Sequence, residues 1–185
     1  MHFSLSDEGG LLFARDRAVF DSFLAGQLAG LRELTLMLAP NINSYKRYTE
    51  GSFAPTAIAW GHDNRTCALR VVGHGSALRF ENRAGGSDLN PYLALSALIA
   101  AGLHGVDQGL ELEPEYQGNA YLAGDKPRLP RTLREARDLF AASALARSAF
   151  GADAVGHYCN AADVELSAFE SAVTDWERVR GFERL

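Results

Sequence analysis

The sequence is poor in cysteine, in proline and in long apolar runs. Its 185 residues include six prolines and two cysteines, Cys67 and Cys159. The cysteines lie far apart and match no metal-ligand spacing, so a reduced, cytoplasmic setting is expected. No apolar run approaches the roughly 20 residues that a membrane-spanning helix needs, and we expect no membrane partner.

Positive charge is also scarce. Lysine and arginine number 18 against 23 acidic residues, which gives a formal net charge of −5. The basic residues are dispersed along the chain, and this argues against a nucleic-acid partner. An apolar content of 47% suits one globular domain or one large part of a longer protein.

Hydrophobic periodicity predicts an α+β fold with helices packed on a sheet. Residues 2–16 indicate two short strands joined by a turn at Gly9 and Gly10. Residues 54–83 hold three extended runs separated by "DN" and "GHG", which is typical of an antiparallel meander.

Four helices are predicted around these strands. Residues 18–38 repeat apolar side chains at helical spacing. A second helix starts at Pro91 behind the capping residue Asn90. Thr132 and Glu135 indicate a capping box for a third helix, and an amphipathic helix is expected over about 161–180.

Charged residues alternate along the last extended run. Arg79, Glu81 and Arg83 share one face of a strand because residues two apart point the same way. A solvated outer face would explain this pattern. So would a polar cavity in which guanidinium groups clamp carboxylate or phosphate and a lone carboxylate binds a metal ion.

Further cations favour the cavity. Lys46 and Arg47 precede the extended runs, and Arg65 and Arg70 belong to the neighbouring run. Few acids accompany them. The set predicts a site for a phosphorylated substrate together with a carboxylate, because charge neutralisation and positioning dominate phosphoryl-transfer catalysis.

Ordered motifs carry a family resemblance over nearly the whole chain. They are "HFSL", "NSYKR", "APTAIAWGHDNRTCALRV", "RFENR", "NPYLALSALIAAGLHG" and the closing "VTDWERVRGFERL". In this order they resemble the C-terminal part of the catalytic domain of glutamine synthetases and the related gamma-glutamyl-amine ligases. Residues 1–185 are accordingly identified as the C-terminal portion of that domain.

The resemblance implies a curved, mostly antiparallel sheet and an ATP-dependent ligase. ATP and glutamate meet in a funnel with divalent ions, Mg²⁺ or Mn²⁺. The side-chain carboxylate of glutamate is phosphorylated, and ammonia or an amine then displaces the phosphate. The resemblance also implies a homo-oligomeric ring.

The resemblance assigns roles by position. The residues that match nucleotide contacts are His2, Ser4, Arg65, Arg70 and Arg79. Of these, Arg65 and Arg70 also match the arginines that act at the reaction centre. Arg47 and Arg83 match residues that bind glutamate, with Lys46 expected to support the loop. Glu81 matches a metal ligand.

One departure from the family pattern bears on the acceptor amine. Where glutamine-forming enzymes carry a glutamate that guards ammonium, this chain has Phe53, which favours a larger amine. A loop shift that brings Glu50 into that role is the alternative.

The family's N-terminal β-grasp domain and upstream metal-binding strands find no match in these residues. We therefore also expect a fragment, either a non-catalytic remnant or an assembly partner of full-length subunits. An unrelated α+β domain with a solvated charged sheet is a third interpretation.

Overall fold

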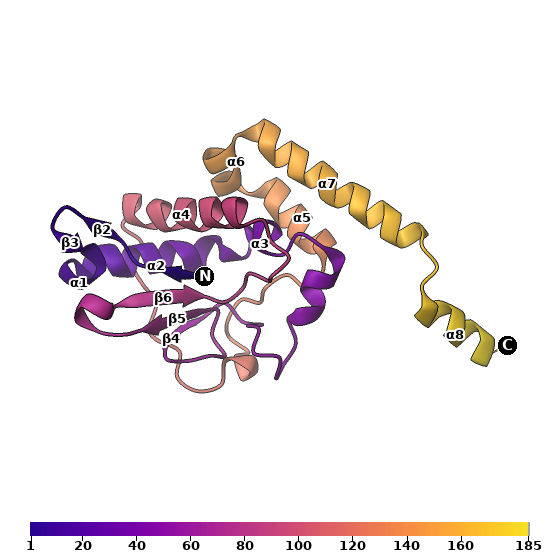
Figure 1. The fold of residues 1–185 in the computed structure, drawn as a ribbon, viewed down its shortest axis with the longest axis horizontal. Helices are drawn as coiled ribbons and strands as arrows, with labels where there is room; N and C mark the ends of the chain where they lie inside the picture. Colours follow the sequence, from indigo (N-terminus) through magenta and orange to yellow (C-terminus); the bar gives the residue numbers. More distant parts are fainter. Residues whose placement is uncertain (185) are drawn as a thin grey trace.

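A four-stranded sheet of order β1-β6-β5-β4 forms the centre of the protein (Figure 1). The computed structural model describes residues 1–184. The strands of this sheet are β1 (His2–Phe3), β4 (Trp60–His62), β5 (Leu69–Val72) and β6 (Arg79–Asn82). Strand β6 pairs antiparallel with both β1 and β5, so the expected α+β class with a mostly antiparallel sheet is confirmed.

The predicted antiparallel meander is wrong at one pairing. Strands β4 and β5 run parallel, with Trp60 opposite Leu69. Residues 63–68 return the chain to the level of Trp60 before β5 begins, so the two strands share a direction. Asp63, at a φ of 48°, starts this return, and its amide donates to the carbonyl of Val71 over 3.0 Å.

The N-terminal hairpin forms as predicted. Strands β2 (Ser6–Asp7) and β3 (Gly10–Leu11) pair antiparallel around the glycine turn. Gly10 adopts a φ of 100°, which a residue with a Cβ rarely does. A one-turn helix, α1 (Leu12–Arg15), follows directly.

The single helix predicted for residues 18–38 is two helices, α2 (Arg17–Leu31) and α3 (Thr35–Leu38). The hydroxyl of Thr35 donates to the carbonyl of Leu31 over 2.7 Å. Such a bond to the residue four positions back competes with the helical backbone and bends the chain there. Periodicity alone does not reveal it.

Helices α2 and α4 (Pro91–Asp107) pack closely against each other over the sheet (Figure 1). Asn90 caps α4 as predicted, because its side chain accepts from the amide of Tyr92 over 3.0 Å. The backbones meet at Gly26 and Gly105. A Cβ on Gly105 would clash with the carbonyl of Ser22, so only glycine permits this approach.

An aromatic core fixes β6 against these helices. Phe80 of β6 is fully buried and stacks on Phe3 with ring centroids 5.5 Å apart. Asn82, also buried, donates to the side chain of Gln27 over 3.0 Å, and Gln27 donates to the carbonyl of Leu98 over 3.1 Å. Phe80 and Asn82 point toward the helices, so the alternate residues of β6 face the other way.

The C-terminal part is helical and begins with α5 (Leu133–Ala142) and α6 (Ala144–Phe150). Thr132 caps α5 by accepting from the amide of Glu135 over 3.1 Å. The predicted reciprocal bond is wrong, because the carboxylate of Glu135 accepts from the amide of Arg131 instead.

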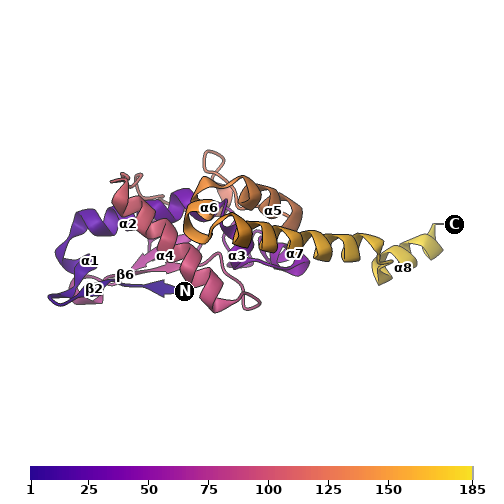
Figure 2. The same cartoon turned by 90° about the horizontal axis from the view of Figure 1, so that it is seen from above.

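The helix predicted for about 161–180 is also two helices, α7 (Ala152–Ser171) and α8 (Asp175–Glu183). Thr174 and Glu177 form a capping box that starts α8. Helix α7 extends away from the sheet and α8 lies at its far end (Figure 2).

Three short 3₁₀ segments complete the described chain: η1 (Ile42–Arg47), η2 (Gly75–Ala77) and η3 (Ala120–Leu122). Within residues 1–184, no helix is long and apolar enough to cross a membrane.

Candidate active site

Glu81 lies at the centre of the charged sheet face. The register places it between His2 on β1 and Arg70 on β5, and directly opposite residues of antiparallel strands share a face. Its Oε2 atom is 2.8 Å from Arg83 Nη1 and 3.5 Å from Arg70 Nη1. Its Oε1 atom is 3.9 Å from His2 Nε2. Three predicted site residues, His2, Arg70 and Arg83, therefore meet at the carboxylate of a fourth, Glu81.

The surroundings of Glu81 keep it ionised. Partial burial alone would raise the pKa of Glu81, but the hydrogen bond and charge of Arg83, with the charges of His2 and Arg70, lower it below its ordinary value. The side chains of Glu81 and Arg83 are 20% and 14% exposed, so solvent screens this pair only weakly.

Arg70 and Arg83 each bind a second partner that holds them in place. Arg70 Nη2 is 2.7 Å from Asp63 Oδ1, in the turn between β4 and β5. Arg83 Nη2 donates to the carbonyl of Phe53 over 2.9 Å. The second contact ties the predicted glutamate-binding arginine to the loop expected to select the amine.

Arg47 reaches the same region from η1. Its guanidinium donates to the carbonyl of Ala84, just beyond Arg83, and Tyr48 donates to the same carbonyl over 2.9 Å. The ring of Tyr48 lies 5.1 Å from the centre of the Arg47 guanidinium. Arg47 thus lies beside the end of β6, and its role in binding glutamate stays a prediction.

An acid that sequence reasoning missed anchors η1. Asp88 accepts from the hydroxyl of Ser44 over 2.5 Å and from the side-chain Nδ2 of Asn41 over 3.2 Å. Burial would raise the pKa of Asp88, but these two hydrogen bonds outweigh it and lower the pKa. The partners are more than 40 residues apart, and no local pattern marks the pairing.

Three arginines of this region retain unused donors. Within residues 1–184, the Nε atoms of Arg47, Arg70 and Arg83 are buried and have no hydrogen-bond partner. A buried, unpaired donor costs free energy, and guanidinium groups bind carboxylate or phosphate through two parallel bonds. A bound anion would take up this capacity after a small movement of the side chains.

The loop after η1 places Phe53 and Glu50 differently. Phe53 is 65% exposed and adopts a φ of 61°, which is unusual for an aromatic residue. Its carbonyl contacts Arg83, as described above. Glu50 instead lines a separate cavity of about 430 Å³ with Tyr121 and Arg128. Phe53, rather than Glu50, is attached to the arginine cluster.

Within residues 1–184, the other predicted residues form no hydrogen bond or ion pair with this cluster. Ser4 and Arg65 are exposed and form no side-chain hydrogen bond with the described residues. Arg79 bonds the carbonyl of Ala77 over 3.0 Å. Lys46 is exposed and has no hydrogen-bond or ion-pair partner in residues 1–184, so no such bond supports the loop role expected for it.

The described residues do not form a metal site by themselves. Residues 1–184 contain no group of three or more His, Cys, Asp or Glu side chains able to hold a metal ion. Magnesium takes about six ligands, and Glu81 would supply one of them. Its Oε2 atom is also occupied by two arginines.

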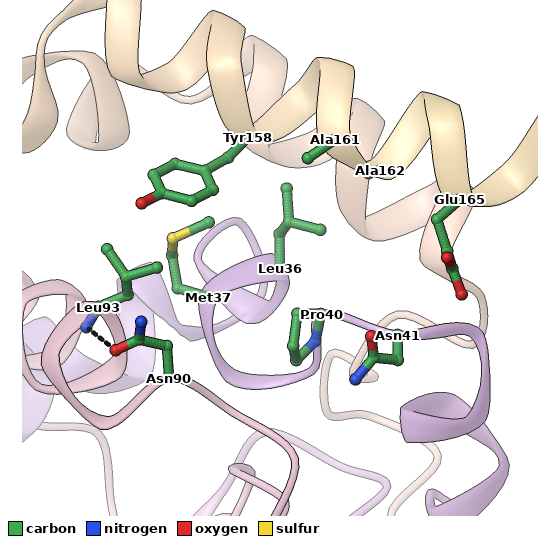
Figure 3. Close-up of a pocket in the computed structure, with 10 residues that line it drawn as sticks. All are labelled: Leu36, Met37, Pro40, Asn41, Asn90, Leu93, Tyr158, Ala161, Ala162 and Glu165. Atoms are coloured by element: carbon green, nitrogen blue, oxygen red, sulfur yellow. Dashed lines mark hydrogen bonds between the residues drawn. The ribbon is translucent and has the colours of Figure 1, made fainter.

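A separate pocket of about 260 Å³ lies between α3, the start of α4 and α7 (Figure 3). Leu36, Met37 and Leu93 line its apolar part. Glu165 is its only charged lining residue. This pocket therefore lacks the cations that ATP or glutamate would need.

Comparison with known proteins decides the family. Residues 1–180 match the family described as glutamine synthetase, catalytic domain. The chain belongs to the glutamine synthetase family. It is 59% identical to gamma-glutamylethanolamide synthetase GlnA4 of Streptomyces coelicolor, over all of this chain and 41% of that protein. It is 39% identical to glutamate–isopropylamine ligase of a Pseudomonas species, over 97% of this chain and 41% of that protein.

A solved structure agrees with this assignment. The GmaS/ADP complex superposes with a TM-score of 0.87 at 27% identity, covering 98% of this chain and 45% of that one. This member of the glutamine synthetase family spans about two-fifths of the length of the two curated relatives described above.

Proposed function

We propose that this chain is part of an ATP-dependent ligase that joins the γ-carboxyl group of glutamate to an amine through γ-glutamyl phosphate. The observation that carries the proposal is the arginine cluster around Glu81, on the sheet face opposite the core. Membership of the glutamine synthetase family and similarity to two gamma-glutamyl-amine ligases support it.

Arg83 and Arg47 are assigned to glutamate. Both lie at the end of β6, and a guanidinium pair can hold the α-carboxylate of an amino acid by charge-assisted bonds. Glu81 orients Arg83 from one side, while the carbonyl of Phe53 fixes it from the other.

Arg70 and Arg65 are assigned to the transferring phosphoryl group, which develops charge on its oxygens during transfer. Asp63 and Glu81 both form ion pairs with Arg70 and orient its charge. His2, Ser4 and Arg79 are assigned to ATP. Glu81 is the residue that this chain would contribute to a magnesium or manganese site.

Phe53 is assigned to the acceptor amine. Its carbonyl contacts Arg83, and its exposed aromatic side chain offers apolar contact to a carbon-bearing amine and no charge to ammonium. We therefore infer that the acceptor is larger than ammonia. The first relatives described above carry ethanolamide and isopropylamine in their names.

The domain assignment and assembly are part of the same proposal. We take residues 1–185 as the C-terminal portion of the catalytic domain, acting in the cytoplasm within a homo-oligomeric ring. Large apolar side chains are exposed on two helices, and this favours packing against other subunits. They are Leu95, Ile99 and Leu103 on α4, and Trp176, Val179 and Phe182 on α8.

A second candidate function follows from the small number of metal ligands in the described residues. Because residues 1–184 offer a single carboxylate in the cluster, the isolated chain could bind glutamate without turning it over, as a non-catalytic subunit or assembly partner.

Phosphate release tests the proposal. The purified chain is incubated with Mg-ATP and glutamate, and with ammonia, ethanolamine, isopropylamine or putrescine in parallel. Release that requires glutamate and one of the larger amines, with a higher kcat/KM than for ammonia, is expected for a competent ligase.

Other outcomes separate the two candidates. Glutamate binding without phosphate release would favour the non-catalytic one. Preference for ammonia would refute the role of Phe53, and failure to bind either glutamate or ATP would refute both candidates.

A further inference from the structure

A cavity of about 390 Å³ lies on the outer side of η1, against α5 and α7. It is within the volume range of small-molecule sites, about 300–1,000 Å³. Its lining residues come from three segments far apart in sequence: Ile42, Tyr45 and Lys46 of η1; Arg131, Thr132, Leu133 and Arg134 at the start of α5; and Leu166, Phe169 and Glu170 of α7.

The floor of this η1 cavity is apolar. Leu133 and Leu166 are buried beneath it, and Phe169 contributes a ring that is 43% exposed. The aryl or alkyl part of a small molecule could pack against the exposed ring and the buried leucines. Burial of apolar area there would be favourable by about 25 cal/mol per Å².

The rim of the cavity is positively charged. Lys46 and the side chain of Arg131 have no ion-pair or hydrogen-bond partner in the part of the chain that is described. Arg134 and Glu170 bind each other, so Glu170 is neutralised locally. Two cations therefore remain available at the mouth.

A buried tyrosine supplies an independent sign of a ligand. Tyr45 is 5% exposed and lines the cavity, and its hydroxyl has no hydrogen-bond partner in residues 1–184. Buried hydroxyl groups are nearly always paired, since an unpaired one costs about 1–3 kcal/mol. The hydroxyl of this lining residue is therefore an unused donor and acceptor.

We propose that the η1 cavity binds an organic carboxylate with an aryl or alkyl body and thereby regulates the hold on glutamate. The carboxylate lies between Lys46 and Arg131, and the apolar body covers Leu166 and Phe169. The pocket of Figure 3 would not take such a ligand, because Glu165 is its only charged lining residue.

Segment η1 connects this cavity to the active site. Lys46 belongs to the cavity, whereas its neighbour Arg47 binds the carbonyl of Ala84 beside the cluster. Segment η1 runs from Ile42 to Arg47 as a 3₁₀ helix, whose hydrogen bonds are poorer than those of an α-helix, so it is easier to displace. This coupling rests on the proposed role of Arg47, whereas binding in the cavity does not.

The first experiment measures binding without ATP or glutamate. Calorimetric titration of the purified chain uses 4-phenylbutyrate as the probe and 4-phenylbutan-1-ol as its neutral counterpart. We expect the acid to bind at least about tenfold more tightly than the alcohol, because two charge-assisted bonds are lost with the carboxylate.

Variants then locate the probe. The double variant Lys46→Gln/Arg131→Gln and the single variant Phe169→Ala should each weaken binding about tenfold or more, while Arg178→Ala on α8 should leave it unchanged. All four side chains are exposed, and thermal melts confirm that each variant is folded. Equal binding of acid and alcohol would overturn the site, as would undiminished binding in the double variant.

The proposed effect of the cavity ligand on glutamate binding is measured separately. Saturating 4-phenylbutyrate should change the Kd for glutamate several-fold, and glutamate should change the Kd for 4-phenylbutyrate by the same factor. If the probe binds in the cavity and the Kd for glutamate stays constant, the regulatory role is refuted. If glutamate itself does not bind, the proposed function fails while the cavity result stands.

Discussion

At the scale of single residues, one carboxylate organises the site. Glu81 Oε2 lies 2.8 Å from Arg83 Nη1 and 3.5 Å from Arg70 Nη1. Its Oε1 atom lies near His2 Nε2. The sequence predicted that Arg79, Glu81 and Arg83 share a face, because strand geometry alternates side chains. It could not predict that Glu81 would be held by arginines of two strands, since that depends on the register.

The acid anchors were beyond prediction for the same reason. Asp63 and Asp88 each fix part of the site through partners brought close only by folding. Neither belongs to a spacing that marks its chemistry. The roles of all the predicted site residues stay predictions, and Ser4, Arg65 and Arg79 in addition form no hydrogen bond or ion pair with the cluster.

Replacement of Glu81 by glutamine should make stability less sensitive to acid. The folded-state pKa of Glu81 is lowered below its ordinary value of 4.5, so its ionised form stabilises the fold above that pH. This contribution is lost as pH falls through the lowered pKa.

At pH 7 we expect Glu81→Gln to lose about 1–3 kcal/mol of unfolding free energy, the range for hydrogen bonds to charged groups. Urea unfolding at pH 7 and at pH 3.5 measures the difference between the two proteins. A gap that widens toward pH 3.5 would contradict the assignment.

At the scale of elements, capping residues were easier to predict than helix continuity. Asn90 and Thr132 cap their helices because the sequence signal is local. The break before α3 depends on a single side-chain bond from Thr35, and periodicity does not report it. The break before α8 was readable, since Thr174 and Glu177 have capping-box spacing.

The parallel pairing of β4 with β5 is another element-scale difference. Three short extended runs with turns between them favour hairpins, and the sequence gives no sign that residues 63–68 would carry the chain back. The amide of Leu69 donates to the carbonyl of Ala59 over 3.1 Å. The same turn brings Asp63 to Arg70, so the unexpected topology builds part of the site.

Two glycines give a matched test of helix packing. Gly105→Ala places a Cβ against the carbonyl of Ser22 and should lower the unfolding free energy by about 1–3 kcal/mol, as overpacking does. Gly156→Ala on α7 meets no atom within 4 Å and should raise it by up to about 1 kcal/mol, through helix propensity.

Chemical denaturation of both variants provides the measurement. If Gly105→Ala is as stable as Gly156→Ala, the close approach of α2 and α4 is wrong.

At the scale of the whole molecule, the proposed glutamate site exists only in the folded chain. Arg47 comes from η1, Arg83 from the end of β6 and Phe53 from the loop that follows η1. The buried chain of bonds from Asn82 through Gln27 to α4 holds β6 in place. A ligand that binds this arrangement and not the unfolded chain must therefore stabilise the whole fold.

Thermal unfolding of the purified chain with and without glutamate tests the central claim most directly. At a glutamate concentration 100 times the Kd, binding stabilises by about 2.7 kcal/mol, so Tm should rise by several degrees. We predict this rise for the wild-type chain and for Arg178→Ala on α8, and its loss in Arg83→Ala. An equal rise in Arg83→Ala, or no rise in the wild-type chain, would contradict the assignment of this arginine cluster to glutamate.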